Sequence, residues 1–421
     1  MKICLVGQKI PVHSRSSDTG LLWPLAKGLN EKGHEVTIIS SHSPIKKYEV
    51  FRDGIRAYFL YEGTSPYKKT HFIDAVQKKF AELHESKKFD LVHSLDGSAI
   101  KIGRHKKNYH VHVAYDIEAT RMSDLFSLMG LYDGSLQSQM KTSIRVAWRF
   151  LQNYFMHDRM LLDTADGIFT TTPQQRTILE RYFLYPDFHT YTVPYGINLG
   201  DLSQREESQG FKLKLQIPEN AKIVLSVSNF TNPTEFQPLL KAFSKLILKS
   251  PNIYLVLLGN GPRWKDVEYM MLKKVLGSRV IMPGAVDASE LLEYISLCSI
   301  YIDLSSQSTG LEPTLIEAMA QKKIVIGSEL SPVSEIIEDG QDGFLVRPAD
   351  ENSLLKLMGE FLDNPLQISQ VGEKAREKVL HVFNRDKMIQ GLLDAYTSIL
   401  ERSELNPLLQ KRAEKPVDKA L

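Results

Sequence analysis

Two carboxylates lie close together in the segment 305–320, SSQSTGLEPTLIEAMA, where a polar loop leads into a predicted helix. Pro313 fits the first helical position because its missing N–H costs nothing there. The N-terminus of a helix commonly binds anions, so the acids Glu312 and Glu317 are unexpected at this place. A carboxylate on a helix flank can accept hydrogen bonds from both hydroxyls of a ribose. Glu317 is therefore a candidate nucleotide ligand, although a solvated acid on the helix face would give the same pattern.

Gly259, Asn260 and Gly261 directly follow a predicted strand in the segment LLGNGPRW. Glycines in such a loop let the backbone approach a ligand closely, and a simple turn between strand and helix explains them as well. The sequence contains no G-x-x-x-x-G-K-[ST], the loop after the first strand lacks the G-x-G-x-x-G pattern, and the histidines lack metal spacing such as H-E-x-x-H. We therefore expect neither a dinucleotide cofactor nor a catalytic metal.

The composition is typical of a globular protein. The chain has 421 residues, of which 43% are hydrophobic and 24% charged, and its formal net charge is +2. This length allows two domains with separate cores, and the small net charge gives no reason to expect nucleic acid as a partner. Cys4 and Cys298 lie in separate apolar runs, which predicts two buried thiols. Because no apolar run reaches the length of a signal peptide or a membrane span, we expect a cytoplasmic protein.

Short apolar runs alternate with helical patterns along the chain, which is typical of parallel α/β domains. The predicted strands are 2–7, 35–40, 55–60, 91–95, 110–115, 167–172 and 189–194, then 222–228, 254–260, 280–284, 300–305, 323–328 and 343–346. A polar, turn-rich stretch at 193–222 separates the two series. Two consecutive doubly wound domains therefore fit better than one large sheet. Ligands of such sheets bind beyond the carboxyl ends of the strands, so we expect the site in a cleft between the domains.

The segment 141–162, KTSIRVAWRFLQNYFMHDRMLL, is aromatic and basic, with no acidic residue before Asp158. A helix of this kind can lie on an anionic membrane. A buried helix beside the first domain explains the composition equally well. Peripheral membrane contact through the N-terminal domain, at the inner face of the membrane, is therefore one of two interpretations.

Taken together, these pieces resemble glycosyltransferase family 4, a family of retaining enzymes with the GT-B fold. LAKGLNEKGHEVTIIS resembles the family's first helix and second strand, FDLVHSLDG its strand before the acceptor side, and YTVPYGIN its linker. LLGNGP, IEAMA and SPVSEIIEDGQDGFLVRPAD follow in the family's order, and FNRDKMIQGLLDAYTSIL resembles the final helix that crosses back to the first domain. The resemblance covers nearly the whole chain.

The resemblance implies two Rossmann-like domains that face each other across a cleft. The acceptor domain would span 1–200 and the nucleotide-sugar domain 201–382, followed by a crossing helix at 383–402 and a charged, disordered tail at 403–421. The family acts without a metal at the reacting centre and uses a nucleotide sugar as substrate. We expect a UDP-sugar as donor, no cofactor, and an unidentified lipid, glycan or protein as acceptor.

Several residues match positions with known roles in the family. Glu317 matches the glutamate that binds the ribose, and residues 259–261 would lie on the side of the base. The backbone N–H groups of Gly310 and Leu311 would touch the phosphates. Ser16 and Ser17 correspond to a Gly-Gly loop that lines the cleft from the first domain.

Other positions depart from the family pattern. Asn229 and Thr234 stand where the family has an Arg and a Lys, Thr309 replaces the first of its two glutamates, and Glu312 replaces a glycine or proline beside the phosphates. Tyr115 stands where a histidine often follows the acceptor-side strand. Losing one group that stabilises developing charge costs ~3–4 kcal/mol of barrier. The loss of the Arg and the Lys and the added charge of Glu312 all disfavour a diphosphate, and Arg263, Lys265 or Arg347 would have to compensate.

The sequence therefore supports two hypotheses from different classes. The first is a hexosyltransferase-like, metal-independent glycosyltransferase that moves a sugar from a nucleotide sugar to an acceptor with retained configuration. The second is a non-catalytic relative that binds a nucleotide, a sugar or a partner protein in the same cleft. A nucleotide-sugar epimerase on the same fold agrees less well with IEAMA and VPYGIN, which resemble the transferases more closely.

Overall fold

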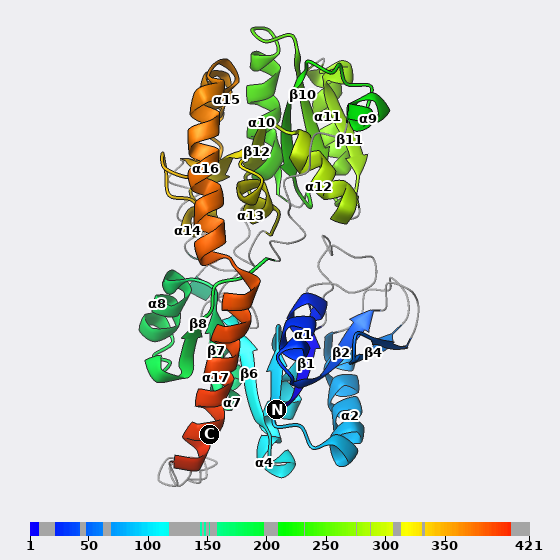
Figure 1. Ribbon diagram of the computed structural model, residues 1–421, viewed down its shortest axis with the longest axis vertical. Helices are drawn as coiled ribbons and strands as arrows, with labels where there is room; N and C mark the ends of the chain where they lie inside the picture. The colour runs from blue at the N-terminus through cyan, green and yellow to red at the C-terminus, as the bar shows by residue number, and fades with distance from the viewer. Residues whose placement is uncertain are drawn as a thin grey trace.

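The computed structural model describes residues 1–7, 22–42, 48–61, 69–117, 144, 147–148, 151, 158–197, 209–230, 232–274, 276–286, 288–305, 313–330 and 333–405. They form two α/β domains, one above the other in Figure 1, each built on its own sheet. The first sheet has the order β3-β4-β2-β1-β5-β6-β7-β8 and the second β11-β10-β9-β12-β13-β14. Two consecutive doubly wound domains are thus confirmed.

The strands of the first sheet are β1 (Lys2–Gly7), β2 (Glu35–His42), β3 (Glu49–Arg52), β4 (Ile55–Tyr61), β5 (Leu91–Ser94), β6 (His112–Asp116), β7 (Gly167–Thr170) and β8 (Thr190–Thr192). Those of the second are β9 (Lys222–Val227), β10 (Ile253–Leu258), β11 (Val280–Gly284), β12 (Ile300–Asp303), β13 (Ile324–Ser328) and β14 (Phe344–Val346). Each predicted strand overlaps one of these. Sequence patterning missed β3, a four-residue edge strand that pairs antiparallel with β4, because its residues are mostly exposed and carry no buried run.

Helices cover both faces of the first sheet. Apolar side chains of α2 (Lys69–Lys87), α3 (Ile100–Arg104), α7 (Arg159–Thr164) and α8 (Pro173–Tyr182) fill one core with β1, β5 and β6. The opposite face packs against α1 (Leu22–Glu31) and against α17 (Arg385–Leu405), the last described helix. The short helix α4 (Lys106–Tyr109) precedes β6.

The second sheet is covered in the same way. One face packs against α9 (Gln209–Lys214), α12 (Ala288–Leu297), α13 (Pro313–Ala320), α14 (Val333–Ile336) and α16 (Pro365–Val382). The other face packs against α10 (Pro233–Leu246), α11 (Trp264–Lys273) and α15 (Glu351–Asp363). Cys4 and Cys298 are buried free thiols, one in each domain, as predicted.

The chain crosses between the domains twice, at adjacent places. The Ile197 N–H donates to the Phe383 carbonyl at 2.9 Å, and the Arg385 N–H donates to the Ile197 carbonyl at 3.1 Å. From there α17 runs back along the first domain (Figure 1), where Ile389, Tyr396 and Ile399 are buried in the core of that domain. The last helix is therefore part of the N-terminal domain's core.

Candidate functional site

The carboxyl edge of the second sheet collects most of the described candidate residues. The strand order reverses between β9 and β12, because β10 and β11 lie on one side of β9 and β12 to β14 on the other. Open α/β sheets bind ligands at the carboxyl ends of the strands at such a reversal. Asn229 follows β9, residues 259–261 follow β10, and Asp303 ends β12, so the fold places all of them along this edge.

The two glycines after β10 are required by a neighbouring loop. A Cβ atom on Gly259 would lie 1.9 Å from the Ser228 carbonyl oxygen, and one on Gly261 would lie 1.7 Å from the Asn229 carbonyl oxygen. Gly259 also has a φ of +116°, which disfavours any other residue. The Arg263 N–H donates to the Phe230 carbonyl at 3.2 Å. The loops after β9 and β10 are therefore in close backbone contact, and a role of residues 259–261 in binding a base stays a prediction.

The N-terminus of α10 already has acceptors for its first donors. Pro233 has no N–H, the Thr234 N–H donates to Asn232 Oδ1 at 3.2 Å, and the Glu235 N–H donates to the Asn232 carbonyl at 3.1 Å. Glu235 is buried in this first turn, and its Oε2 accepts from Ser228 Oγ at 2.9 Å. Because the first N–H donors are already paired and a carboxylate lies in the first turn, this helix start offers few donors to a phosphate. No sequence motif singled out Glu235, although it directly follows Thr234.

Two further carboxylates are buried next to the candidate site. Asp303 ends β12, and its Oδ1 accepts from the Ser305 N–H at 3.0 Å. Burial raises the pKa of Asp303, against the effect of that hydrogen bond. Glu317 lies in α13, which begins at Pro313 as predicted, and its exposed fraction is 0%. The alternative of a solvated acid at Glu317 is therefore wrong, and its assignment as a ribose ligand stays a prediction.

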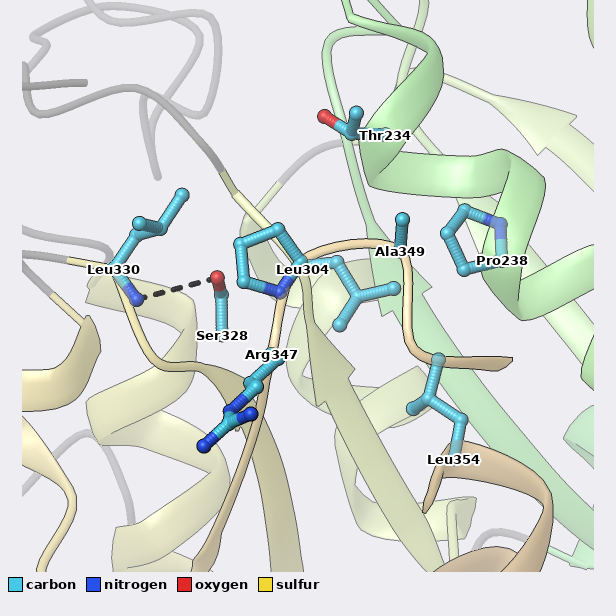
Figure 2. A pocket seen from close by; sticks show the side chains of 9 residues that line it. Thr234, Pro238, Leu304, Ser328, Leu330, Arg347, Ala349 and Leu354 are labelled. Atoms are coloured by element: carbon cyan, nitrogen blue, oxygen red, sulfur yellow. Dashed lines mark hydrogen bonds between the residues drawn. The ribbon is translucent and has the colours of Figure 1, made fainter. Parts of the chain in front are cut away.

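A small pocket lies between the start of α10 and the ends of β12, β13 and β14 (Figure 2). Its open volume is about 10 Å³, room for roughly one water molecule and far too small for a nucleotide. Its polar lining comes from Thr234, Ser328 and Arg347. The Ser328 Oγ accepts from the Leu330 N–H at 3.3 Å.

Of the three cations proposed to compensate for the missing Arg and Lys, Arg347 shares this pocket with Thr234. Its guanidinium points away from Thr234 in Figure 2, its side chain is 81% exposed, and Nε lies 3.6 Å from Glu329 Oε2. Arg263, the residue directly before α11, instead pairs with Asp266 in the first turn of that helix at 2.9 Å, and Lys265 is exposed on the same helix. Of these three cations, Arg347 is therefore the best candidate to supply the positive charge that Thr234 lacks.

Tyr115 is a core residue of the first domain. It is fully buried, and its hydroxyl donates to the Ala99 carbonyl at 3.4 Å, beside Gly103. Side chains alternate along a strand, so Tyr115 faces α3 and α7. This packing contradicts a catalytic role for Tyr115 at the edge of the sheet. The next residue, Asp116, places a polar side chain at that edge instead.

Asp116 belongs to a hydrogen-bonded chain that no sequence motif revealed. Its Oδ1 lies 2.9 Å from His93 Nε2, and His93 Nδ1 lies 2.6 Å from the Tyr396 hydroxyl. His93 ends up almost fully buried, whereas the Asp116 side chain is 28% exposed. Tyr396 comes from α17, 303 positions further along the chain, so only the fold brings these residues together.

Several predicted residues lie outside the described part of the chain: Ser16, Ser17, Thr309, Gly310, Leu311 and Glu312. The tail beyond 405 lies outside it too. In the segment 141–162, the described Ile144, Trp148 and Leu151 are 67%, 70% and 50% exposed, so a buried helix is wrong for these three positions. Within the described residues, no helix is long and apolar enough to cross a bilayer.

Family models match both domains. The model described as "Glycosyltransferase Family 4" matches residues 22–201, and the one described as "Glycosyl transferases group 1" matches residues 208–378. The chain is a family 4 glycosyltransferase. The order of the two matches reproduces the two domains, and the resemblance inferred from the motifs is confirmed.

This glycosyltransferase is similar to curated and solved proteins over most of its length. It is 24% identical over 382 residues to N-acetyl-alpha-D-glucosaminyl L-malate synthase of Bacillus anthracis, covering 89% of this chain and 92% of that one. Sucrose-phosphate synthase from Thermosynechococcus elongatus matches with a TM-score of 0.74 at 19% identity, over 96% of this chain and 100% of that one. HepE of Anabaena, in complex with UDP and glucose, matches with a TM-score of 0.67 at 15% identity, over 94% and 100%. The GT-B fold is thereby confirmed.

Proposed function

We propose that this glycosyltransferase moves a sugar from a nucleotide sugar, most simply a UDP-sugar, to a hydroxyl-bearing acceptor with retained configuration. The observation that carries the proposal is the position of Glu317. Its carboxylate is fully buried on α13, the first described helix after β12, and β12 pairs with β9 at the point where the strand order reverses. A carboxylate can accept hydrogen bonds from both hydroxyls of a ribose, and this is the role that we assign to Glu317. The complex of HepE with UDP and glucose supports a donor of this class.

Leaving-group stabilisation would differ from that in relatives that carry an Arg and a Lys. Asn229 and Thr234 supply neutral donors, which form weaker hydrogen bonds to an anion than charged groups do. Arg347 is exposed, and a surface pair such as Arg347–Glu329 contributes only about 0–1 kcal/mol. Its guanidinium is therefore free to turn toward a diphosphate bound beside Thr234. We assign Arg347 the electrostatic role that Asn229 and Thr234 do not fill.

A non-catalytic binding function is the second candidate. The buried Glu235, the buried Asp303 and the capped start of α10 all make this edge poorer for a diphosphate than a free helix N-terminus. These three features favour a chain that binds a nucleoside or sugar without breaking the glycosidic bond. Turnover decides between the two candidates.

Titration calorimetry with UDP, UDP-glucose and GDP-mannose, followed by an assay of donor hydrolysis, tests the proposal. We expect a UDP-sugar to bind and to turn over slowly, and Glu317→Gln to weaken UDP binding about 10-fold or more, since a hydrogen bond to a charged group contributes about 1.5–3 kcal/mol. Glu360→Gln, exposed on α15, is the matched control. If no nucleotide binds at all, the proposed enzyme function is refuted. If a nucleotide sugar binds without any turnover, the second candidate is favoured.

Glu312→Gly tests the added negative charge directly. If Glu312 repels the phosphates, this substitution removes the repulsion and tightens UDP binding, with a smaller effect on uridine. The comparison of UDP with uridine isolates the phosphate contribution. Equal affinity of both proteins for UDP would show that Glu312 does not oppose the diphosphate.

A further inference from the structure

A continuous hydrogen-bond chain connects α17 to the end of β6. It runs from the Tyr396 hydroxyl to His93 Nδ1 at 2.6 Å and from His93 Nε2 to Asp116 Oδ1 at 2.9 Å. Burial raises the pKa of Tyr396, and the nearby Asp116 charge raises it further, so the phenol keeps its proton. The Tyr396 O–H then donates to Nδ1, and the N–H at Nε2 donates to Asp116. Both ring nitrogens of His93 are thus paired within this chain.

The imidazole of His93 is held firmly in this orientation. It is 1% exposed, its ring centroid lies 4.7 Å from that of Phe169, and the Tyr396 ring meets it edge-on at 5.7 Å. Phe169 also packs edge-to-face on Tyr396. An apolar side chain would fill this space without requiring two polar partners, so packing alone does not explain a histidine here. What the histidine adds is a fixed direction for the Asp116 carboxylate.

Asp116 is placed to meet a ligand. It is the last residue of β6, and the preceding residues Ala114 and Tyr115 are fully buried, whereas the Asp116 side chain is 28% exposed. In Figure 1 the strands of the first sheet rise toward the second domain. Among the ion pairs of the described residues, Asp116 meets only His93. One hydrogen bond from Nε2 uses only part of the acceptor capacity of a carboxylate, which leaves acceptor sites for a ligand.

We propose that Asp116 is an acceptor-binding residue of this glycosyltransferase, and that His93 and Tyr396 are its positioning residues. The proposal rests on the proposed function and deepens it. A carboxylate accepts hydrogen bonds and repels anions, so it selects acceptors that present a hydroxyl or an ammonium group without a carboxylate or phosphate beside it. The substrate class is therefore a neutral or cationic alcohol, such as a sugar or another polyol.

The first experiment compares acceptors, with UDP-glucose as donor and methyl glucoside, glycerol or glycerol 3-phosphate as acceptor. We expect transfer to the neutral alcohols to exceed transfer to glycerol 3-phosphate. Asp116→Asn should lower kcat/KM for the neutral acceptor about 10-fold or more, while the KM for UDP-glucose and the rate of its hydrolysis stay within about 2-fold. Faster transfer to the anionic acceptor, or an equal loss of donor binding in Asp116→Asn, would overturn the proposal.

The positioning role has its own variant and control. Tyr396→Phe keeps the ring and removes the hydroxyl, and should raise the KM for the acceptor about 3-fold to 10-fold with the donor KM unchanged. Ile399→Val, a buried position on the same helix, lowers stability without touching the chain and should leave the acceptor KM unchanged. If the two variants affect the acceptor KM equally, Tyr396 is merely structural and the proposal for it fails.

A measurement without turnover separates this proposal from the proposed function. In the full chain labelled with ¹⁵N-histidine, the ring signals of His93, assigned by their loss in His93→Gln, should shift when methyl glucoside is added. The shift should disappear in Asp116→Asn and persist in Asp394→Asn, an exposed site on α17. If no neutral alcohol shifts these signals while UDP-glucose is still hydrolysed, the acceptor proposal fails and the enzyme assignment stands. If methyl glucoside shifts these signals but no UDP-sugar binds, the acceptor proposal stands and the enzyme assignment fails.

Discussion

Gly261 and Asn229 are in backbone contact: a Cβ atom on Gly261 would stand 1.7 Å from the Asn229 carbonyl oxygen. Two loops that follow different strands therefore have a fixed spacing, and Asn229 is held at the edge where a donor would bind. The absence of a side chain at Gly261 is what permits the contact.

Gly261→Ala should force the two loops apart. We expect the free energy of unfolding to fall by about 1–3 kcal/mol, as for other overpacked sites, and UDP affinity to fall with it because Asn229 moves. Urea denaturation and titration calorimetry measure the two effects. Gly210→Ala is the control, since a Cβ there meets nothing within 4 Å and alanine favours the helix α9. A Gly261→Ala protein as stable as the parent would contradict the contact.

Arg347→Gln should weaken the binding of UDP more than that of uridine. The reason is that the guanidinium is assigned to the diphosphate, and a charge-assisted hydrogen bond contributes about 1.5–3 kcal/mol. The salt dependence of UDP binding should become shallower as well. Lys356→Gln, an exposed cation on α15, should change neither. Equal losses for UDP and uridine would place Arg347 outside the phosphate site.

Asp166 should make the stability of the first domain depend on acid pH. Burial alone would raise the pKa of this carboxyl, but hydrogen bonds from His112, Lys106 and the Val113 N–H outweigh it and hold the pKa below its ordinary value. A lowered folded pKa means that the stabilisation is present above the unfolded pKa of about 3.9 and is lost as the pH falls through the folded pKa.

We therefore expect Asp166→Asn to cost about 1–3 kcal/mol at pH 7 and progressively less below about pH 4. Thermal unfolding followed at several pH values measures this difference. Asp74→Asn, at an exposed position of α2, should show a far smaller difference at every pH. A cost for Asp166→Asn that is the same at pH 3 and pH 7 would be inconsistent with the lowered pKa.

Peripheral membrane contact of the first domain stays a proposal, and Trp148 offers its test. Ile144, Trp148 and Leu151 are exposed at a spacing that places them on one face of a helix, within a segment rich in Arg and Lys. Such a face binds anionic lipid through apolar burial and charge attraction.

We expect the chain to sediment with vesicles that contain phosphatidylglycerol and less with neutral vesicles, and Trp148→Ser to reduce the bound fraction severalfold. Leu248→Ser, an exposed apolar position of the second domain, serves as the control. If the parent and Trp148→Ser sediment identically, the segment 141–162 is not the surface that contacts the membrane.

The sequence by itself determined the two domains, the strands and the family, because apolar periodicity and motif order are local properties. Pro313 at the start of α13 and the buried Cys4 and Cys298 followed from the same local signals. The edge strand β3 escaped, since a short exposed strand has no buried run. Glu317 was found as a candidate, but its complete burial depends on how α13 packs.

Only the tertiary structure decided which polar groups meet. Tyr115 faces the core, whereas Asp116 lies at the edge of the sheet, because successive side chains of a strand point to opposite faces. The His93–Tyr396 contact spans 303 positions, a separation at which no pattern in a single sequence indicates proximity. The requirement for a glycine at position 261 likewise comes from a loop 32 residues earlier in the chain, at Asn229. Local physics set the elements of this glycosyltransferase, and packing between distant segments set its candidate site.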